Sequence, residues 1–88
     1  MKSMKFKVGD KVESDKGSSD VKSMKAVWVG EIVELIAEND EGGCFGTLGK
    51  WEPIVSPEGK THPLWADHDP NEKPSLRQLW GSHLVKTK

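Results

Sequence analysis

Residues 6–13 read FKVGDKVE, and residues 27–35 read VWVGEIVEL. Apolar and polar residues alternate in both phrases, which is typical of a strand that buries one face. Each phrase also contains a glycine, Gly9 or Gly30, at which the backbone can turn tightly or be approached closely. The phrases therefore predict two consecutive β-strands. A bulge or bend is expected at Gly30, because the apolar residues of the second strand change face there.

Turn-forming residues divide the rest of the chain into further strands. Adjacent glycines predict a hairpin turn over residues 39–43, and a Ser-Pro-Glu-Gly run predicts another turn at 56–59. Residues 15–23, rich in Asp, Ser and Gly, predict an exposed loop. We expect strands over residues 6–14, 26–38, 44–51, 61–66, 75–80 and 84–87.

The second strand has a helical alternative over residues 31–38, where Ile32, Leu35 and Ile36 would form one apolar stripe. We favour the strand because the segment is β-branched and follows Val29 without a helix cap. The sequence thus predicts an all-β fold, mostly strand, with under about 15% helix. Its opening phrases are typical of a small SH3-like barrel, here of five or six strands with a long insertion before the last ones.

One domain is expected over residues 1–88, with residues 1–5 frayed, because a chain of 88 residues has room for a single small core. Alternation along the strands predicts which side chains fill that core, and Trp28 is expected beside them. The residues expected to be buried are Val12, Val27, Ile32, Val33, Leu79 and Leu84.

The charge balance of the chain indicates which classes of partner are not favoured. The net charge is −1, from thirteen Lys and Arg against fourteen Asp and Glu. Such a balance gives no overall attraction to nucleic acid or to an anionic membrane. No stretch approaches the roughly 20 apolar residues that span a bilayer, and no signal peptide is expected. The single cysteine, Cys44, has no partner for an internal disulfide. A cytoplasmic protein is therefore expected.

No motif in the chain is specific for catalysis or for a metal. His62, Asp67, His68 and Asp69 are close in sequence, but neighbouring side chains alternate in direction in an extended chain and cannot all face one ion. Cys44 has no neighbouring base that would make it a nucleophile, and a small buried side chain is its expected role. We expect no catalytic residue, no metal site and no cofactor.

The four tryptophans point instead to binding, because they exceed what so small a core needs. Aromatic side chains next to long loops are typical of surfaces that receive peptides or bases. The expected partners are a second copy of the chain and a protein or peptide. The predicted binding residues are Trp65, Arg77, Gln78, Leu79 and Trp80.

Three short phrases carry a family resemblance: VGDKV at 8–12, W-x-G-x-I-V at 28–33, and QLW at 78–80 followed by LVK at 84–86. Together they resemble the type II dihydrofolate reductases, plasmid- and integron-borne SH3-like barrels that assemble as tetramers around a central pore. The resemblance implies that Gln78, Leu79 and Trp80 would contact folate and NADPH. Trp80 stands where the family has tyrosine.

Three hypotheses of different classes follow. The first, which we favour, is a non-enzymatic, oligomeric SH3-like interaction module of bacterial or mobile-element origin. The second is a pore enzyme like the type II reductases. The third is a nucleic-acid-binding barrel, which the net charge does not favour, and which would use the lysines around the first loop. Those lysines are Lys2, Lys5, Lys7, Lys22 and Lys25.

Overall fold

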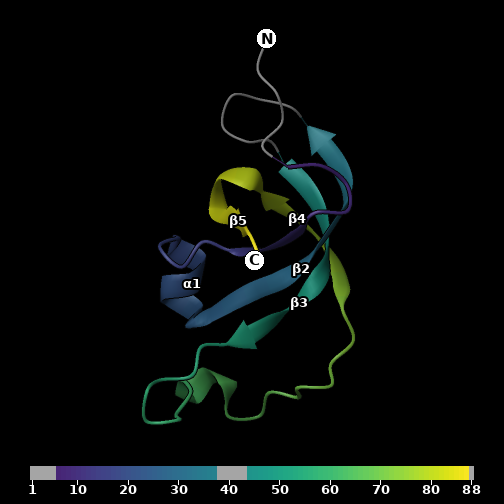
Figure 1. Cartoon of the computed structure of the whole chain (residues 1–88). Coiled ribbons are helices and arrows are strands. Elements are labelled where there is room, and N and C mark those ends of the chain that lie inside the picture. Colours follow the sequence, from purple (N-terminus) through teal and green to yellow (C-terminus); the bar gives the residue numbers. More distant parts are fainter. Residues whose placement is uncertain (1–5, 38–43, 88) are drawn as a thin grey trace.

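The computed structural model describes residues 6–37 and 44–87. Within them, five antiparallel strands form one sheet in the order β4-β3-β2-β1-β5. The sheet curls, so that β4 and β5 come near each other although neither pairs with the other (Figure 1). The elements are β1 (Lys11–Ser14), α1 (Ser19–Met24), β2 (Ala26–Ala37), β3 (Cys44–Pro53), η1 (Pro63–Trp65), β4 (Ser75–Trp80), η2 (Gly81–His83) and β5 (Leu84–Lys86).

This architecture confirms the all-β fold class, the number of strands and the long insertion, which runs over residues 54–74 between β3 and β4. The strand interpretation of residues 31–38 is confirmed as far as Ala37. The expected hairpin turn at 39–43 and the frayed segment at 1–5 lie outside the described residues.

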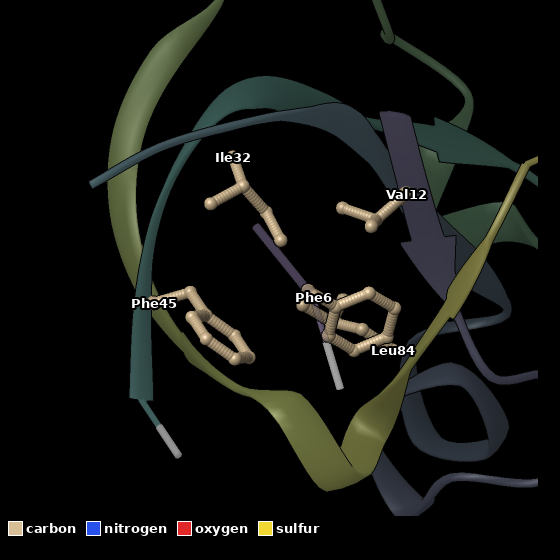
Figure 2. Packing of buried hydrophobic residues seen from close by; sticks show 5 residues of the cluster. All are labelled: Phe6, Val12, Ile32, Phe45 and Leu84. Atoms are coloured by element: carbon tan, nitrogen blue, oxygen red, sulfur yellow. The ribbon is translucent and has the colours of Figure 1, made fainter. Parts of the chain in front are cut away.

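The core lies inside the curl of the sheet. Five buried side chains meet there from β1, β2, β3, β5 and the segment before β1, and the ribbon bends around them (Figure 2). The rings of Phe6 and Phe45 contact edge to face, with centroids 5.5 Å apart, a favourable geometry for aromatic pairs. The cluster consists of Phe6, Val12, Ile32, Phe45 and Leu84.

The predicted core is confirmed for four residues, namely Val12, Val27, Ile32 and Leu84. Leu79 is only partly buried, packed against the cluster. The prediction for Val33 is wrong, since this side chain is 39% exposed. Register shifts by one residue between Ile32 and Glu34, which leaves Val33 without a partner on β3. Val33 is therefore the extra residue of a bulge and faces away from the core.

The expected bulge at Gly30 is also wrong in its position. Gly30 pairs regularly with Gly49, and the two register shifts of β2 come later in the strand. The two backbones are in close contact at this regular pair. A Cβ atom added to Gly30 would lie 2.6 Å from the carbonyl oxygen of Leu48 and 2.8 Å from the Cα of Gly49.

Part of the expected loop at 15–23 is helical, which corrects the prediction of an irregular segment there. Helix α1 begins after Ser18, whose hydroxyl accepts a hydrogen bond from the backbone N–H of Val21 at 3.4 Å. It ends at Lys25 in the left-handed conformation, with φ 54°. Local capping closes both ends of the helix, and the buried side chain of Val21 fixes it to the protein.

The short strand expected at 61–66 is wrong. Residues Pro63–Trp65 form the 3-10 turn η1. The ring of His62 caps this turn, because its Nδ1 accepts a hydrogen bond from the backbone N–H of Leu64 at 3.1 Å. Proline has no N–H to offer a neighbouring strand and is well suited to the first position of a helical turn.

Candidate functional site

A cleft of about 350 Å³ opens at one end of the curled sheet. Strands β3 and β4 form one wall, and α1 and η2 contribute the other side. We call it the β4 cleft, because β4 contributes the largest share of its lining. Its lining residues are Ser14, Asp20, Met24, Trp51, Arg77, Gln78, Leu79, Trp80, His83 and Leu84.

Four of the five predicted binding residues line this cleft, and they are the four consecutive residues of β4 from Arg77 to Trp80. In the sheet register, Arg77 and Leu79 are opposite Thr47 and Phe45, which are buried. These two residues therefore belong to the concave face of the sheet, and Gln78 and Trp80 to its outer face. Trp80, which is 53% exposed, also forms part of the rim of the cleft.

Two further tryptophans support the cleft from the concave face. Trp28 and Trp51 are direct cross-strand partners, and their rings contact edge to face with centroids 5.8 Å apart. Trp28 is buried, and its backbone N–H donates to the hydroxyl of Ser14 at 3.1 Å. The guanidinium carbon of Arg77 lies 5.9 Å from the centroid of the Trp28 ring. The site therefore has an aromatic floor, and the guanidinium of Arg77 lies over one of its rings.

Sequence reasoning missed Trp51 as a site residue and assigned Trp28 to the core alone. The signal that could have found them is their pairing across β2 and β3, which places both rings on the face that Arg77 shares. That pairing depends on the register of the hairpin, and two bulges in β2 alter the register.

Several buried polar atoms at this end of the sheet have no hydrogen-bond partner among the described residues. They are the indole nitrogens of Trp28 and Trp51 and the hydroxyl of Thr47. A tryptophan side chain can only donate a hydrogen bond. Two of the three unpaired groups are therefore donors that lack an acceptor.

A weak ion pair crosses between the two elements on the far side of the cleft. The Nδ1 atom of His83 in η2 lies 3.7 Å from a carboxylate oxygen of Asp20 in α1. Both side chains are well exposed, so solvent screens the interaction. Within residues 6–37 and 44–87, no three His, Cys, Asp or Glu side chains are placed to hold a metal ion. The cleft combines apolar side chains with a few polar groups, a composition that ligand sites in proteins often have.

Trp65, the fifth predicted residue, lies outside the β4 cleft. Its indole N–H donates to the backbone carbonyl of Met24 at 2.6 Å, and its ring contacts that of His68 with centroids 5.3 Å apart. Trp65 thereby ties the insertion to Met24, the last residue of α1, which also lines the cleft. Its ring borders a separate acidic hollow, lined by Leu64, Trp65, Asp67, His68, Asp69 and Glu72.

Replacing Trp65 with phenylalanine is expected to loosen the insertion without unfolding the sheet. The variant keeps an aromatic ring but loses the hydrogen bond to Met24, a loss of about 1 kcal/mol for a typical neutral pair. Amide hydrogen exchange should rise over residues 54–74 and stay unchanged in β2 and β3. Equal acceleration across the whole sheet would show that Trp65 belongs to the global folding unit instead.

A comparison of the sequence with protein-family models, with curated proteins and with solved structures finds no match in any of the three. The resemblance based on residues 8–12, 28–33 and 78–80 therefore stays an expectation. Among the described residues, no helix has the length and apolar character needed to cross a membrane.

Proposed function

We propose that this chain is a small interaction module, and that an extended peptide segment of a protein partner binds in the β4 cleft. The observation that carries the proposal is the position of Trp80, a half-exposed indole on the rim of a cleft whose wall is an edge strand. Exposed tryptophans at such positions supply large contact area at low entropic cost.

The edge position of β4 suggests how a peptide would bind. Within the described part of the chain, β4 pairs only with β3, so alternate backbone N–H and C=O groups along its other side would be available to an added strand. Main-chain hydrogen bonds of this kind give affinity, and pockets for alternate side chains give specificity. The apolar lining from Met24, Leu79 and Trp80 offers such a pocket.

The proposal predicts that Trp80→Ala weakens peptide binding far more than it weakens folding. Peptides selected against the wild-type chain from a phage-displayed library serve as the probe, and fluorescence titration gives the dissociation constants. Loss of one aromatic anchor is expected to weaken binding by at least tenfold, a cost of about 1.4 kcal/mol or more. The melting temperature should change by only a few degrees, because half of the side chain is exposed.

Leu76→Ala is the matched control. Leu76 lies on the same strand and is 60% exposed, but it does not line the cleft. Its removal should leave peptide affinity unchanged. Equal losses in the two variants would place the binding surface on the outer face of the sheet. Selection that yields no cleft-binding peptide would overturn the proposal.

Self-association through the outer face of the sheet is a second candidate. Leu48 on β3 and Leu76 on β4 are directly opposite each other and are 44% and 60% exposed. With Trp80 they leave apolar surface beside Gln78, the residue that the family resemblance would place in a pore. Sedimentation would detect such an assembly, and turnover of dihydrofolate with NADPH would favour the reductase hypothesis over the interaction module. A cytoplasmic location remains part of the proposal, on the evidence of the single cysteine.

A further inference from the structure

Arg77 is the only arginine of the chain, and it lies in the β4 cleft. Among the described residues it has no carboxylate partner. The ion pairs in that part of the chain join His83 to Asp20 and Lys86 to Asp10. Arginine at a cleft without an internal partner presents donors on a planar group whose shape matches a carboxylate.

The guanidinium is also held in position. It lies over the ring of Trp28, with 5.9 Å from its central carbon to the ring centroid. Trp28 itself cannot move easily, because it is 1% exposed and packs edge to face on Trp51. A guanidinium that stacks on an aromatic face keeps its N–H edges available, and less entropy is lost when a ligand engages them.

The other polar side chains of the β3–β4 wall are the indole of Trp51 and the amide of Gln78. Trp51 lines the cleft, and its indole nitrogen is buried and has no acceptor among the described residues. Arginine and tryptophan side chains donate hydrogen bonds and accept none. The one carboxylate in the lining, Asp20, belongs to α1 and is 3.7 Å from His83. The β3–β4 wall therefore carries one cationic donor, Arg77, and no carboxylate, and the amide oxygen of Gln78 is its neutral acceptor.

We propose that the β4 cleft selects a ligand that carries a carboxylate next to an apolar group. The two carboxylate oxygens would accept parallel N–H bonds from Arg77, and the apolar group would contact Leu79 and Trp80. This inference rests on the proposed function, since it gives the chemistry of the peptide. The carboxylate comes from a Glu or Asp side chain or from a free C-terminus, and both sources offer the same group.

Fragment binding tests the carboxylate directly. The isotope-labelled chain is titrated with 3-phenylpropionate and, separately, with the neutral 3-phenylpropionamide, while the indole N–H signals and the Arg77 Nε–H signal are followed. The acid should bind with a dissociation constant on the order of 1 mM and at least tenfold more tightly than the amide. Added salt should weaken only the acid.

Substitutions at Arg77 separate charge from folding. Arg77→Gln should remove the preference for the acid and leave the weak binding of the amide, whereas Arg77→Lys should keep part of the preference because the charge remains. Arg77 is exposed, so both variants should melt near the wild-type temperature. Equal affinity for acid and amide in the wild-type chain, or no binding of the acid on the order of 10 mM, would overturn the inference.

Titrations with two further peptides distinguish the two sources of the carboxylate. They also separate the carboxylate inference from the proposal of a peptide-binding module. One peptide carries an internal Glu and an amidated C-terminus, and the other carries no acidic residue and a free C-terminus. If the first peptide binds more tightly, the site recognises an acidic side chain. If the second binds more tightly, the site recognises a free C-terminus. If library peptides without any carboxylate bind in the cleft as tightly as those with one, the module stands and the carboxylate inference fails.

Discussion

Replacing Ile32 with alanine is expected to destabilise the fold by about 2–5 kcal/mol, the range for truncation of a buried Ile or Leu. Ile32 is fully buried and contributes to the cluster that also contains Phe45 and Val12. A chain of 88 residues has a total stability of only about 5–10 kcal/mol. Urea unfolding at 25 °C should therefore show a much lower midpoint with an unchanged slope.

Val33→Ala is the matched control for that experiment. Val33 is the next residue on the same strand and also β-branched, but it is 39% exposed at the bulge. Its truncation should cost less than about 1 kcal/mol, as expected for a partly exposed site. Similar losses at both positions would mean that Val33 packs in the core, as the sequence alone had suggested.

The contrast between these two neighbours shows where sequence reasoning reaches its limit. Alternation predicted most of the strands because period two is a local property of the chain. A bulge is not local in this sense, since it exists only relative to a partner strand. Two bulges in β2, at Val33 and Ile36, each add one residue that β3 does not match. The first of them places Glu34 opposite Gly46 and Leu35 opposite Phe45, so that the residues after Val33 change face relative to a regular strand.

Helix α1 was missed for a different reason. Six residues are too few for a helix to be stable alone, and only Val21 of this one is buried. The signals for it were present in Ser18 and in Asp20 of the first turn, but the same residue types are typical of loops. Packing of Val21 on the protein decides between the two, and packing cannot be seen in a short polar stretch.

The candidate site was predicted only in its contiguous part. Arg77 to Trp80 follow one another along β4. The prediction of a binding surface near Trp80 therefore included all four residues. The opposite side of the cleft comes from α1 and η2, through Asp20, Met24 and His83. Asp20 and Met24 are distant in sequence from β4 and lie in a helix that was not expected, whereas His83 lies in the short turn directly after β4. Trp65 was included for its ring alone, and its role is to anchor the insertion.

Replacing Gly49 with alanine is expected to disrupt the sheet as strongly as the loss of a core side chain, although it adds only one methyl group. Gly49 and Gly30 are cross-strand partners at the centre of the β2–β3 pair. A Cβ atom on Gly49 would collide with the carbonyl oxygen of Val29 and would lie 2.6 Å from the Cα of Gly30. The contacted atoms are backbone, so no rotation of a side chain can relieve the overlap.

The two strands must then separate where they hold Trp28 against Trp51. The cost should reach about 3 kcal/mol, the upper end of the usual range for overpacking. Gly17→Ala is the control, because its added methyl would meet only a side-chain oxygen of Asp15, at 3.5 Å. Thermal melts should show a large loss for the first variant and almost none for the second. Because the strain lies under the aromatic floor of the β4 cleft, a Gly49→Ala chain that stays folded should also lose peptide affinity. Wild-type stability in that variant would show that β2 and β3 are not in close backbone contact at this point.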